Sequence, residues 1–308
     1  MKFRKITALV LAGALMFSMA GCAGKSSKDK AAGDSEKEPV KIATKPMTEQ
    51  FILGEMLKQL IEEKAGYEVE LTKGIGGGTS NIQPAMEKGE FDLYPEYTSS
   101  GWILVLGHEA GEVSDDEILA KLQEEYEEKF DMTWIGLYGQ NNTYAVVVRE
   151  DTAKKYDLET CSDLAAVSDQ LVFGGNPDYI ERADGLPGMS SVYGFQFKEI
   201  KDIDIGLKYQ ALRNGDIDVT NGYTTDAQIS QDDVKVLKDD KSYQVNYFCS
   251  TVVRKDALKK YPKLKETLEL MDGVLTDQKM AELNYQVEEE GRDEAEVAEE
   301  FLKSSGLL

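Results

Sequence analysis

The chain has 308 residues and carries 57 acidic against 35 basic residues, which gives a formal net charge of −22. This length accommodates one large or two medium domains, and 41% hydrophobic residues suffice for a globular core. The acidity argues against a nucleic-acid partner, because such binding needs a basic surface. A single histidine and three cysteines argue against most metal and nucleophile chemistry and against a disulfide scaffold.

The first residues have the pattern of an export signal. Three basic residues within the first five positions precede an apolar run over residues 6–19, and Cys22 follows Ala-Gly. The run is shorter than the roughly 20 residues of a membrane span. A cysteine in this place resembles the bacterial lipoprotein signal, which predicts removal of residues 1–21 and lipidation of Cys22; ordinary secretion is the alternative. Residues 22–39 are polar and predict a flexible tether. We therefore expect an extracytoplasmic protein, lipid-anchored to the bacterial cell membrane.

From Val40 onward, short apolar runs alternate with segments of helical period. The predicted strands are Val40–Ala43, Tyr67–Leu71, Phe91–Tyr94, Tyr144–Val148, Leu171–Phe173, Ile217–Val219 and Thr251–Val253. The predicted helices are one from Thr48 to Gly66, then Asp115–Phe130, Gly206–Arg213, Ala257–Leu270 and Asp277–Glu288. This alternation predicts an α/β fold with mixed, mainly parallel sheets and helices on both faces.

Two segments of the chain are repeated. Residues 85–98 match residues 211–224, and in both copies a tyrosine follows the central glycine by eight positions. Residues 147–156 match residues 252–261, each copy beginning with Val-Val-Arg. Because the two repeated segments recur in the same order along the chain, they predict two similar lobes.

The repeats single out four tyrosines, of which Tyr97 and Tyr223 occupy equivalent positions. Tyr97 and Tyr223 follow buried strands, where open α/β sheets bind their ligands. Tyr144 and Tyr247 precede the Val-Val-Arg strands, where the chain is expected to cross between lobes. We expect all four to face one cleft between the lobes.

The remaining reactive residues do not form a catalytic or metal-binding pattern. His108 follows an apolar stretch and is interpreted as a surface or packing residue, and no Cys-x-x-Cys or His-Glu-x-x-His is present. The glycine-rich Gly74–Ser80 lacks the phosphate-loop residues and predicts a tight turn into a helix. Cys161 and Cys249 can be free or paired, which the sequence does not decide. No metal or cofactor is expected.

A group of tyrosines suits a ligand with a quaternary ammonium. Such a cation has no N–H to donate, so carboxylates alone recognise it poorly. Aromatic faces attract it with about 0.5–1 kcal/mol each when exposed, and about 2 kcal/mol when desolvated.

Several short motifs carry a resemblance that covers the chain from about Val40 to its end. They are Lys45–Gln50, Tyr94–Thr98, Asn141–Tyr144, Asp216–Val219 and Glu282–Val287. Together they resemble the substrate-binding lipoproteins of glycine betaine/carnitine/choline ABC transporters. The resemblance implies a two-lobed periplasmic-binding-protein fold of type II that binds its ligand in the interlobe cleft. Lobe 1 is expected at residues 40–142 and 247–308, and lobe 2 at residues 143–246.

The resemblance also implies roles for individual residues. Tyr97, Tyr144, Tyr223 and Tyr247 correspond to a cage around a trimethylammonium group. Lys45, Ser100 and Arg182 match the residues that hold a ligand carboxylate, with serine where threonine is frequent, and Asn142 adjoins the cage. Two cations facing the ligand favour a zwitterion over choline.

We therefore expect a monomeric receptor that performs no chemistry and passes betaine-like solutes to a permease driven by a cytoplasmic ATPase. An amino-acid or polyamine receptor of the same fold is one alternative, and a ligand-sensing domain is another. An extracytoplasmic enzyme is disfavoured, because no nucleophile–base pair is recognisable.

Overall fold

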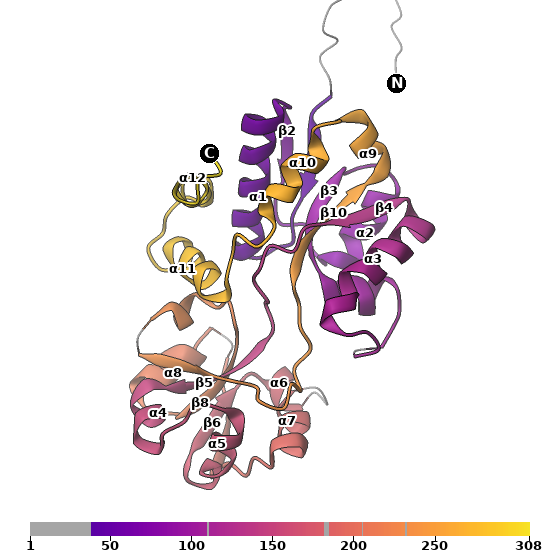
Figure 1. Ribbon diagram of the computed structural model, residues 1–308. Coiled ribbons are helices and arrows are strands. Elements are labelled where there is room, and N and C mark those ends of the chain that lie inside the picture. The colour runs from indigo at the N-terminus through magenta and orange to yellow at the C-terminus, as the bar shows by residue number, and fades with distance from the viewer. Residues whose placement is uncertain (1–37, 110, 182–184, 205, 232) are drawn as a thin grey trace, which may run out of the picture. The chain divides into compact units, whose positions relative to one another are not determined.

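The computed structural model describes residues 38–308 except 110, 182–184, 205 and 232 (Figure 1). Cys22, the expected lipidation site, and Arg182, one of the expected ligand-binding residues, lie outside the described residues. In the described part of the chain, no helix is both long and apolar enough to cross a membrane.

Two five-stranded sheets organise residues 38–308. The first sheet has the order β2 (Val69–Thr72), β1 (Val40–Ala43), β3 (Leu93–Tyr97), β10 (Cys249–Arg254), β4 (Met132–Ile135). The second has the order β7 (Glu199–Asp202), β6 (Val172–Gly175), β8 (Val219–Tyr223), β5 (Tyr144–Arg149), β9 (Val234–Leu237). Both sheets are mixed, as expected. The expectation that they are mainly parallel is wrong, because β10 and β5 each pair antiparallel with both neighbours, so antiparallel pairs are as numerous as parallel ones.

Helices cover both faces of each sheet. Around the first sheet they are α1 (Thr48–Leu60), η1 (Ile61–Ala65), α2 (Thr79–Glu87), η2 (Ser100–Val105), α3 (Asp115–Phe130), α9 (Lys255–Lys260), α10 (Leu264–Leu268), η5 (Glu269–Met271), α11 (Asp277–Glu288) and α12 (Glu294–Ser304). Around the second they are α4 (Glu150–Tyr156), α5 (Cys161–Ala165), η3 (Ser168–Gln170), α6 (Pro177–Glu181), α7 (Leu186–Tyr193), α8 (Lys208–Asn214) and η4 (Ala227–Ser230).

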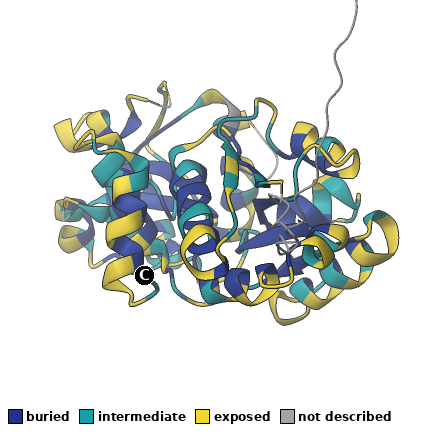
Figure 2. Cartoon of the chain, turned by 90° about the horizontal axis from the view of Figure 1, so that it is seen from above, coloured by how far each residue is buried: buried dark blue, intermediate teal, exposed yellow. Residues whose placement is uncertain are grey.

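Successive residues of each central strand face opposite layers of the core. In β5, Val146 and Val148 pack toward α4, α5 and α7, whereas Ala145 and Val147 pack toward α8. Figure 2 shows the result: buried residues gather on the strands and on the helix faces toward them, and exposed residues lie on the outward faces. Because strand side chains alternate, each sheet needs an apolar layer on both sides.

The two sheets have equivalent topology, as the internal repeats predicted. In the first sheet Val253 pairs with Leu93, and in the second Val148 pairs with Val219. These are the residues that the repeats place in correspondence, so each repeat contributes the same antiparallel pair of strands to its sheet.

The aspartate of the Gly-x-x-Asp repeat has the same structural role in both sheets. The backbone N–H of Lys41 donates to Asp92 Oδ2 at 2.9 Å, and that of Val172 donates to Asp218 Oδ2 at 3.0 Å. Each carboxylate thereby satisfies an N–H of the neighbouring parallel strand, at the strand end where the ladder leaves it without a partner.

Two segments, residues 136–143 and 238–248, connect the sheets. They run alongside each other: Asn142 N donates to Tyr247 O at 3.1 Å, and Tyr138 N donates to Cys249 O at 2.9 Å. Helix α11 also contacts both halves, since it packs on α1 and on η4, and its Asn284 Nδ2 donates to Thr225 O at 2.8 Å.

Some sequence-based expectations need correction or completion. The single helix expected over Ala257–Leu270 is wrong: α9 ends at Lys260 and α10 begins at Leu264, because Pro262 has no N–H and cannot continue a helix. The glycine-rich Gly74–Ser80 does form a turn into α2, as expected. Cys161 and Cys249 are free and buried.

His108 is a packing residue, as expected. Its ring stacks on Trp102 with centroids 3.9 Å apart, and its Nε2 lies 2.8 Å from Glu125 Oε1.

Candidate functional site

A cavity of about 570 Å³ lies between the two sheets, at the carboxyl ends of β3 and β8. Side chains from both sheets and from α1 and α11 form its wall. The lining residues are Lys45, Met47, Thr48, Glu49, Tyr97, Ser100, Leu104, Asn142, Tyr144, Tyr223, Thr225, Asp226, Ala227, Tyr247, Asn284 and Glu288. This volume is in the range typical of small-molecule sites.

All four tyrosines that the repeats singled out line this cavity. Tyr97 ends β3, and Tyr223 ends β8, where it pairs across the sheet with Tyr144 at the start of β5. The rings of Tyr144 and Tyr223 are stacked, with centroids 5.0 Å apart and planes inclined by 24°. Tyr247 comes from the second connecting segment, just before β10.

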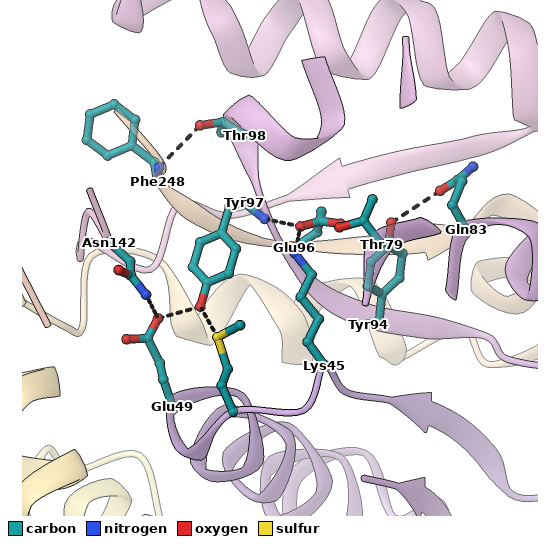
Figure 3. A network of polar contacts seen from close by, with 11 residues as sticks. Lys45, Glu49, Thr79, Gln83, Tyr94, Glu96, Tyr97, Thr98, Asn142 and Phe248 are labelled. Atoms are coloured by element: carbon teal, nitrogen blue, oxygen red, sulfur yellow. Dashed lines mark hydrogen bonds and ion pairs between the residues drawn. The ribbon is translucent and has the colours of Figure 1, made fainter. Parts of the chain in front are cut away.

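Lys45 lies in the wall, but a carboxylate neutralises its charge. Its ammonium pairs with Glu96, which is fully buried, and lies 4.6 Å from the centroid of the Tyr97 ring (Figure 3). Thr79 Oγ1 donates to the other oxygen of Glu96 at 2.7 Å. Lys45 is therefore not an unpaired cation awaiting a ligand carboxylate, which removes one reason for preferring a zwitterion over choline.

Glu49 is a cavity residue that sequence analysis did not single out. It lies in the first turn of α1, and its Oε1 accepts hydrogen bonds from Tyr97 Oη at 2.6 Å and from Asn142 Nδ2 at 3.3 Å (Figure 3). Burial raises the pKa of Glu49, although these donors and the nearby Thr225 and Asn284 favour the ionised form. The residue was overlooked because an acidic residue in a first helical turn is ordinary capping chemistry.

A second ion pair lies behind Tyr223. Asp226 Oδ2 accepts from Tyr209 Oη at 2.7 Å and from the Tyr223 backbone N–H at 3.0 Å, and it lies 3.5 Å from Lys208 Nζ. Desolvation lowers the pKa of Lys208, which is only 3% exposed. Lys208 lines a neighbouring cavity of about 410 Å³ that shares Tyr223 and Asp226 with the first.

Two further expected ligand-binding residues, Ser100 and Asn142, also line the cavity. Ser100 begins η2 and is buried in the cavity wall, and Asn142 lies in the first connecting segment. Seven of the eight expected ligand-binding residues thus line one cavity, and the eighth, Arg182, is outside the described residues. Their roles toward a ligand stay a prediction. Among residues 38–308 as described, no group of three or more His, Cys, Asp or Glu side chains is arranged to hold a metal ion.

The two equivalent sheets and the ligand-sized cavity between them define a bilobal binding protein. Residues 38–304 match the family described as the substrate-binding domain of the ABC-type glycine betaine transport system, and the chain belongs to this family. It is therefore a substrate-binding protein of a transport system and not an enzyme.

Named relatives agree with this assignment. The chain is 42% identical over 272 residues to the ergothioneine transport permease/ergothioneine binding protein EgtU of Helicobacter pylori, and the match covers 88% of this chain and 48% of that one. The chain thus spans about half the length of that relative. It is 37% identical over 279 residues to the carnitine transport binding protein OpuCC of Listeria monocytogenes, with 90% of each covered.

A solved structure shows the same fold at comparable identity. The crystal structure of a glycine betaine/carnitine/choline ABC transporter superposes with a TM-score of 0.82 at 36% identity. The match covers 87% of this chain and 99% of that chain.

Proposed function

We propose that this protein captures quaternary ammonium osmoprotectants, namely glycine betaine, carnitine or choline, in a cage formed by Tyr97, Tyr144, Tyr223 and Tyr247. The observation that carries the proposal is that tyrosines from both sheets and from a connecting segment line one cavity. Several aromatic faces at about 0.5–2 kcal/mol each supply a useful share of the roughly 8 kcal/mol that micromolar binding requires.

The part of the ligand beyond its ammonium group is expected to face Ser100, Asn142 and Arg182. Ser100 and Asn142 offer hydrogen bonds to a hydroxyl or a carboxylate, and an arginine suits a carboxylate through forked, charge-assisted bonding. Because Lys45 is already paired with Glu96, choline fits the described wall as well as a zwitterion does. Ergothioneine, a trimethylated amino-acid zwitterion, belongs to the same ligand class.

Binding is expected to close two lobes over the ligand. We propose lobe 1 as residues 40–142 and 247–308 and lobe 2 as residues 143–246, hinged on the two connecting segments. Small-angle scattering would show a smaller radius of gyration with choline than without it. An unchanged radius at saturation would contradict closure.

Delivery to a membrane permease, driven by a cytoplasmic ATPase, is the proposed role of the closed, monomeric form. The export signal and Cys22 support a lipid anchor outside the cytoplasm. Incorporation of labelled palmitate into the wild-type chain, and its loss in Cys22→Ser, would test the anchor.

Calorimetry with the full-length chain tests the ligand class. Glycine betaine, carnitine, choline and ergothioneine are titrated alongside glutamine and spermidine. Heat from at least one of the first four and none from the last two is expected. In the Arg182→Ala variant, glycine betaine affinity should fall more than choline affinity; equal losses would contradict the assignment of Arg182 to a carboxylate.

The carboxylates of Glu49 and Asp226 in the wall favour a second candidate, a receptor for polyamines or amino acids. Such a ligand carries N–H groups that donate to carboxylates directly. Heat from spermidine or glutamine alone would favour this candidate over the tyrosine cage. A ligand-sensing domain that acts on a signalling partner would show the same ligand binding as a transport receptor.

A further inference from the structure

One buried carboxylate in the cavity has no cationic partner among the described residues. Glu49 is 3% exposed, and no Lys, Arg or His of the described chain forms an ion pair with it. Its Oε1 is held by the hydroxyl of Tyr97 and the amide of Asn142, while its buried Oε2 makes no hydrogen bond of good geometry with the described residues.

The other carboxylates around the cavity differ from Glu49. Glu96 is neutralised by Lys45, and Asp226 lies 3.5 Å from Lys208. Glu288, at the end of α11, is more exposed than Glu49, so solvent screens part of its charge, although desolvation raises its pKa. Glu49 alone among these carboxylates combines burial, a fixed position and a missing counter-charge. An unpaired buried charge costs free energy, and a bound cation would offset this cost.

We propose that Glu49 is the counter-ion of the ligand's positively charged head and that it makes the cavity select ligands by charge as well as by shape. This inference rests on the proposed quaternary-ammonium function. The head needs no N–H for the interaction, because the attraction is between net charges. The bonds from Tyr97 and Asn142 keep the carboxylate in place, so little reorganisation accompanies binding.

The same bond couples Glu49 to the cage. Tyr97 donates its hydroxyl proton to Glu49 and presents its ring in the cavity wall, so a single contact orients an aromatic face and a carboxylate together (Figure 3). At a separation of about 6 Å and an effective dielectric constant of about 20, the charge–charge attraction corresponds to about 100-fold in affinity.

The test compares two ligands of one shape. Choline and 3,3-dimethylbutan-1-ol differ by replacement of the charged nitrogen with carbon, and both are titrated into the full-length wild type and Glu49→Gln. We expect Glu49→Gln to weaken choline by about 10- to 100-fold and to change the affinity of the neutral alcohol, measured by competition, by less than about threefold.

Two further variants serve as controls for charge, reach and burial. Glu49→Asp keeps the charge at shorter reach and should retain most of the choline affinity that Glu49→Gln loses. Glu290→Gln removes an exposed carboxylate that lies outside the cavity wall and should change choline affinity by less than about threefold. Thermal unfolding of each variant verifies that it is folded.

The outcomes separate the two proposals. If Glu49→Gln weakens choline and the neutral alcohol by the same factor, Glu49 has a structural role and the counter-ion proposal is wrong. The same conclusion follows if Glu49→Asp and Glu49→Gln lose the same choline affinity. An unchanged choline affinity in Glu49→Gln would overturn it as well. Failure of the wild type to bind any quaternary ammonium ligand would instead overturn the proposed function, and the counter-ion with it.

Discussion

The ionisable side chains around the cavity tolerate burial by different means. Glu96 and Lys45 neutralise each other, and Thr79 donates a further hydrogen bond to Glu96. Glu49 depends on a hydroxyl and an amide, which satisfy one oxygen without supplying a positive charge. The pKa of Glu49 is raised for this reason, because burial disfavours the ionised form more than neutral donors can offset. Ligand affinity should consequently depend on pH.

Choline affinity is expected to increase with pH through the raised pKa of Glu49 and then to level off, because a cation binds the ionised form better. The Glu49→Gln variant should lose this dependence. Calorimetric titrations between pH 4.5 and pH 8, compared between wild type and variant, measure the effect. A parallel pH dependence in both proteins would assign it to another group.

Other titratable groups also lie around Glu49. Tyr97 on β3 and Cys249 on β10 have pKa values raised by burial, so both stay neutral over this range. Glu288 on α11 has a pKa raised by desolvation and is the main competitor, so Glu288→Gln is the control. Lys45 remains paired with Glu96, and Asp226 lies beside Lys208.

The same shift has a consequence for stability. A carboxyl whose pKa is higher in the folded than in the unfolded state contributes stability at low pH, and this contribution is lost as pH rises through the folded-state pKa. The free energy of unfolding of Glu49→Gln should therefore rise relative to wild type as pH increases from about 4.5. Urea unfolding at several pH values measures it, and an opposite trend would contradict the raised pKa.

The tyrosine rings allow a test of their electrostatic role. Tyr144→Leu should weaken choline binding by about 1–2 kcal/mol, whereas Tyr144→Phe should change it by less than about 0.5 kcal/mol, because the ring face is retained. Tyr156→Leu, half-buried outside the cavity, is the matched control and should have no effect on binding. Equal losses in Tyr144→Leu and Tyr144→Phe would indicate a hydrogen bond instead of a ring contact.

At the scale of elements, the internal repeat determined how much could be predicted. It placed a strand near each of β3, β5, β8 and β10 and a tyrosine near one end of each, but the pairing of β3 with β10 and of β8 with β5 was not predicted. The short edge strand β7 was missed, since its Glu-Ile-Lys-Asp sequence is largely exposed and has no apolar alternation. Helix α12 was missed because its many glutamates resemble a solvated run, although Asp293 caps it and Phe301 packs inward.

The repeated aspartates should matter equally to both sheets. Asp92→Ala and Asp218→Ala each remove the acceptor of a neighbouring strand's N–H and should lower the free energy of unfolding by about 1–3 kcal/mol. The loss should be larger for Asp218, which also pairs with Arg149 at 3.1 Å.

Exposed acidic residues two positions earlier in each repeat provide the controls. Glu90→Ala and Asp216→Ala should change the free energy of unfolding by less than about 0.5 kcal/mol in the same urea titrations. Losses of similar size in all four variants would show that net charge, not the strand-end hydrogen bond, is responsible.

At the scale of the whole molecule, the cavity draws its wall from both sheets, the connecting segments and α11. The contacts between these distant segments could not be predicted from the sequence, because they depend on how the two sheets are placed. Helix α11 illustrates the difficulty: its bounds were predicted correctly, but its packing against both α1 and η4 was not foreseen. A ligand bound here should stabilise the fold as a whole.

Choline at about 100 times its dissociation constant should raise the free energy of unfolding by about 2.7 kcal/mol, since it binds only the folded chain. Thermal and urea unfolding measure the change, with sodium chloride at the same concentration as the control. A similar increase with sodium chloride would attribute the effect to salt. An increase in wild type and none in Tyr144→Leu at the same choline concentration would connect it to the cavity.

The two thiols described above give the folded region an experimental advantage. Cys161 is 1% exposed with its pKa raised by burial to about 12, and Cys249 is fully buried with a raised pKa, so both are poor nucleophiles toward maleimide dyes. In a Cys22→Ser background, cysteines introduced at Glu124 on α3 and Lys154 on α4, whose side chains are 66% and 74% exposed, would react selectively. A fluorophore pair at these positions would follow the approach of one half toward the other in single molecules, without prior removal of any native cysteine from the fold.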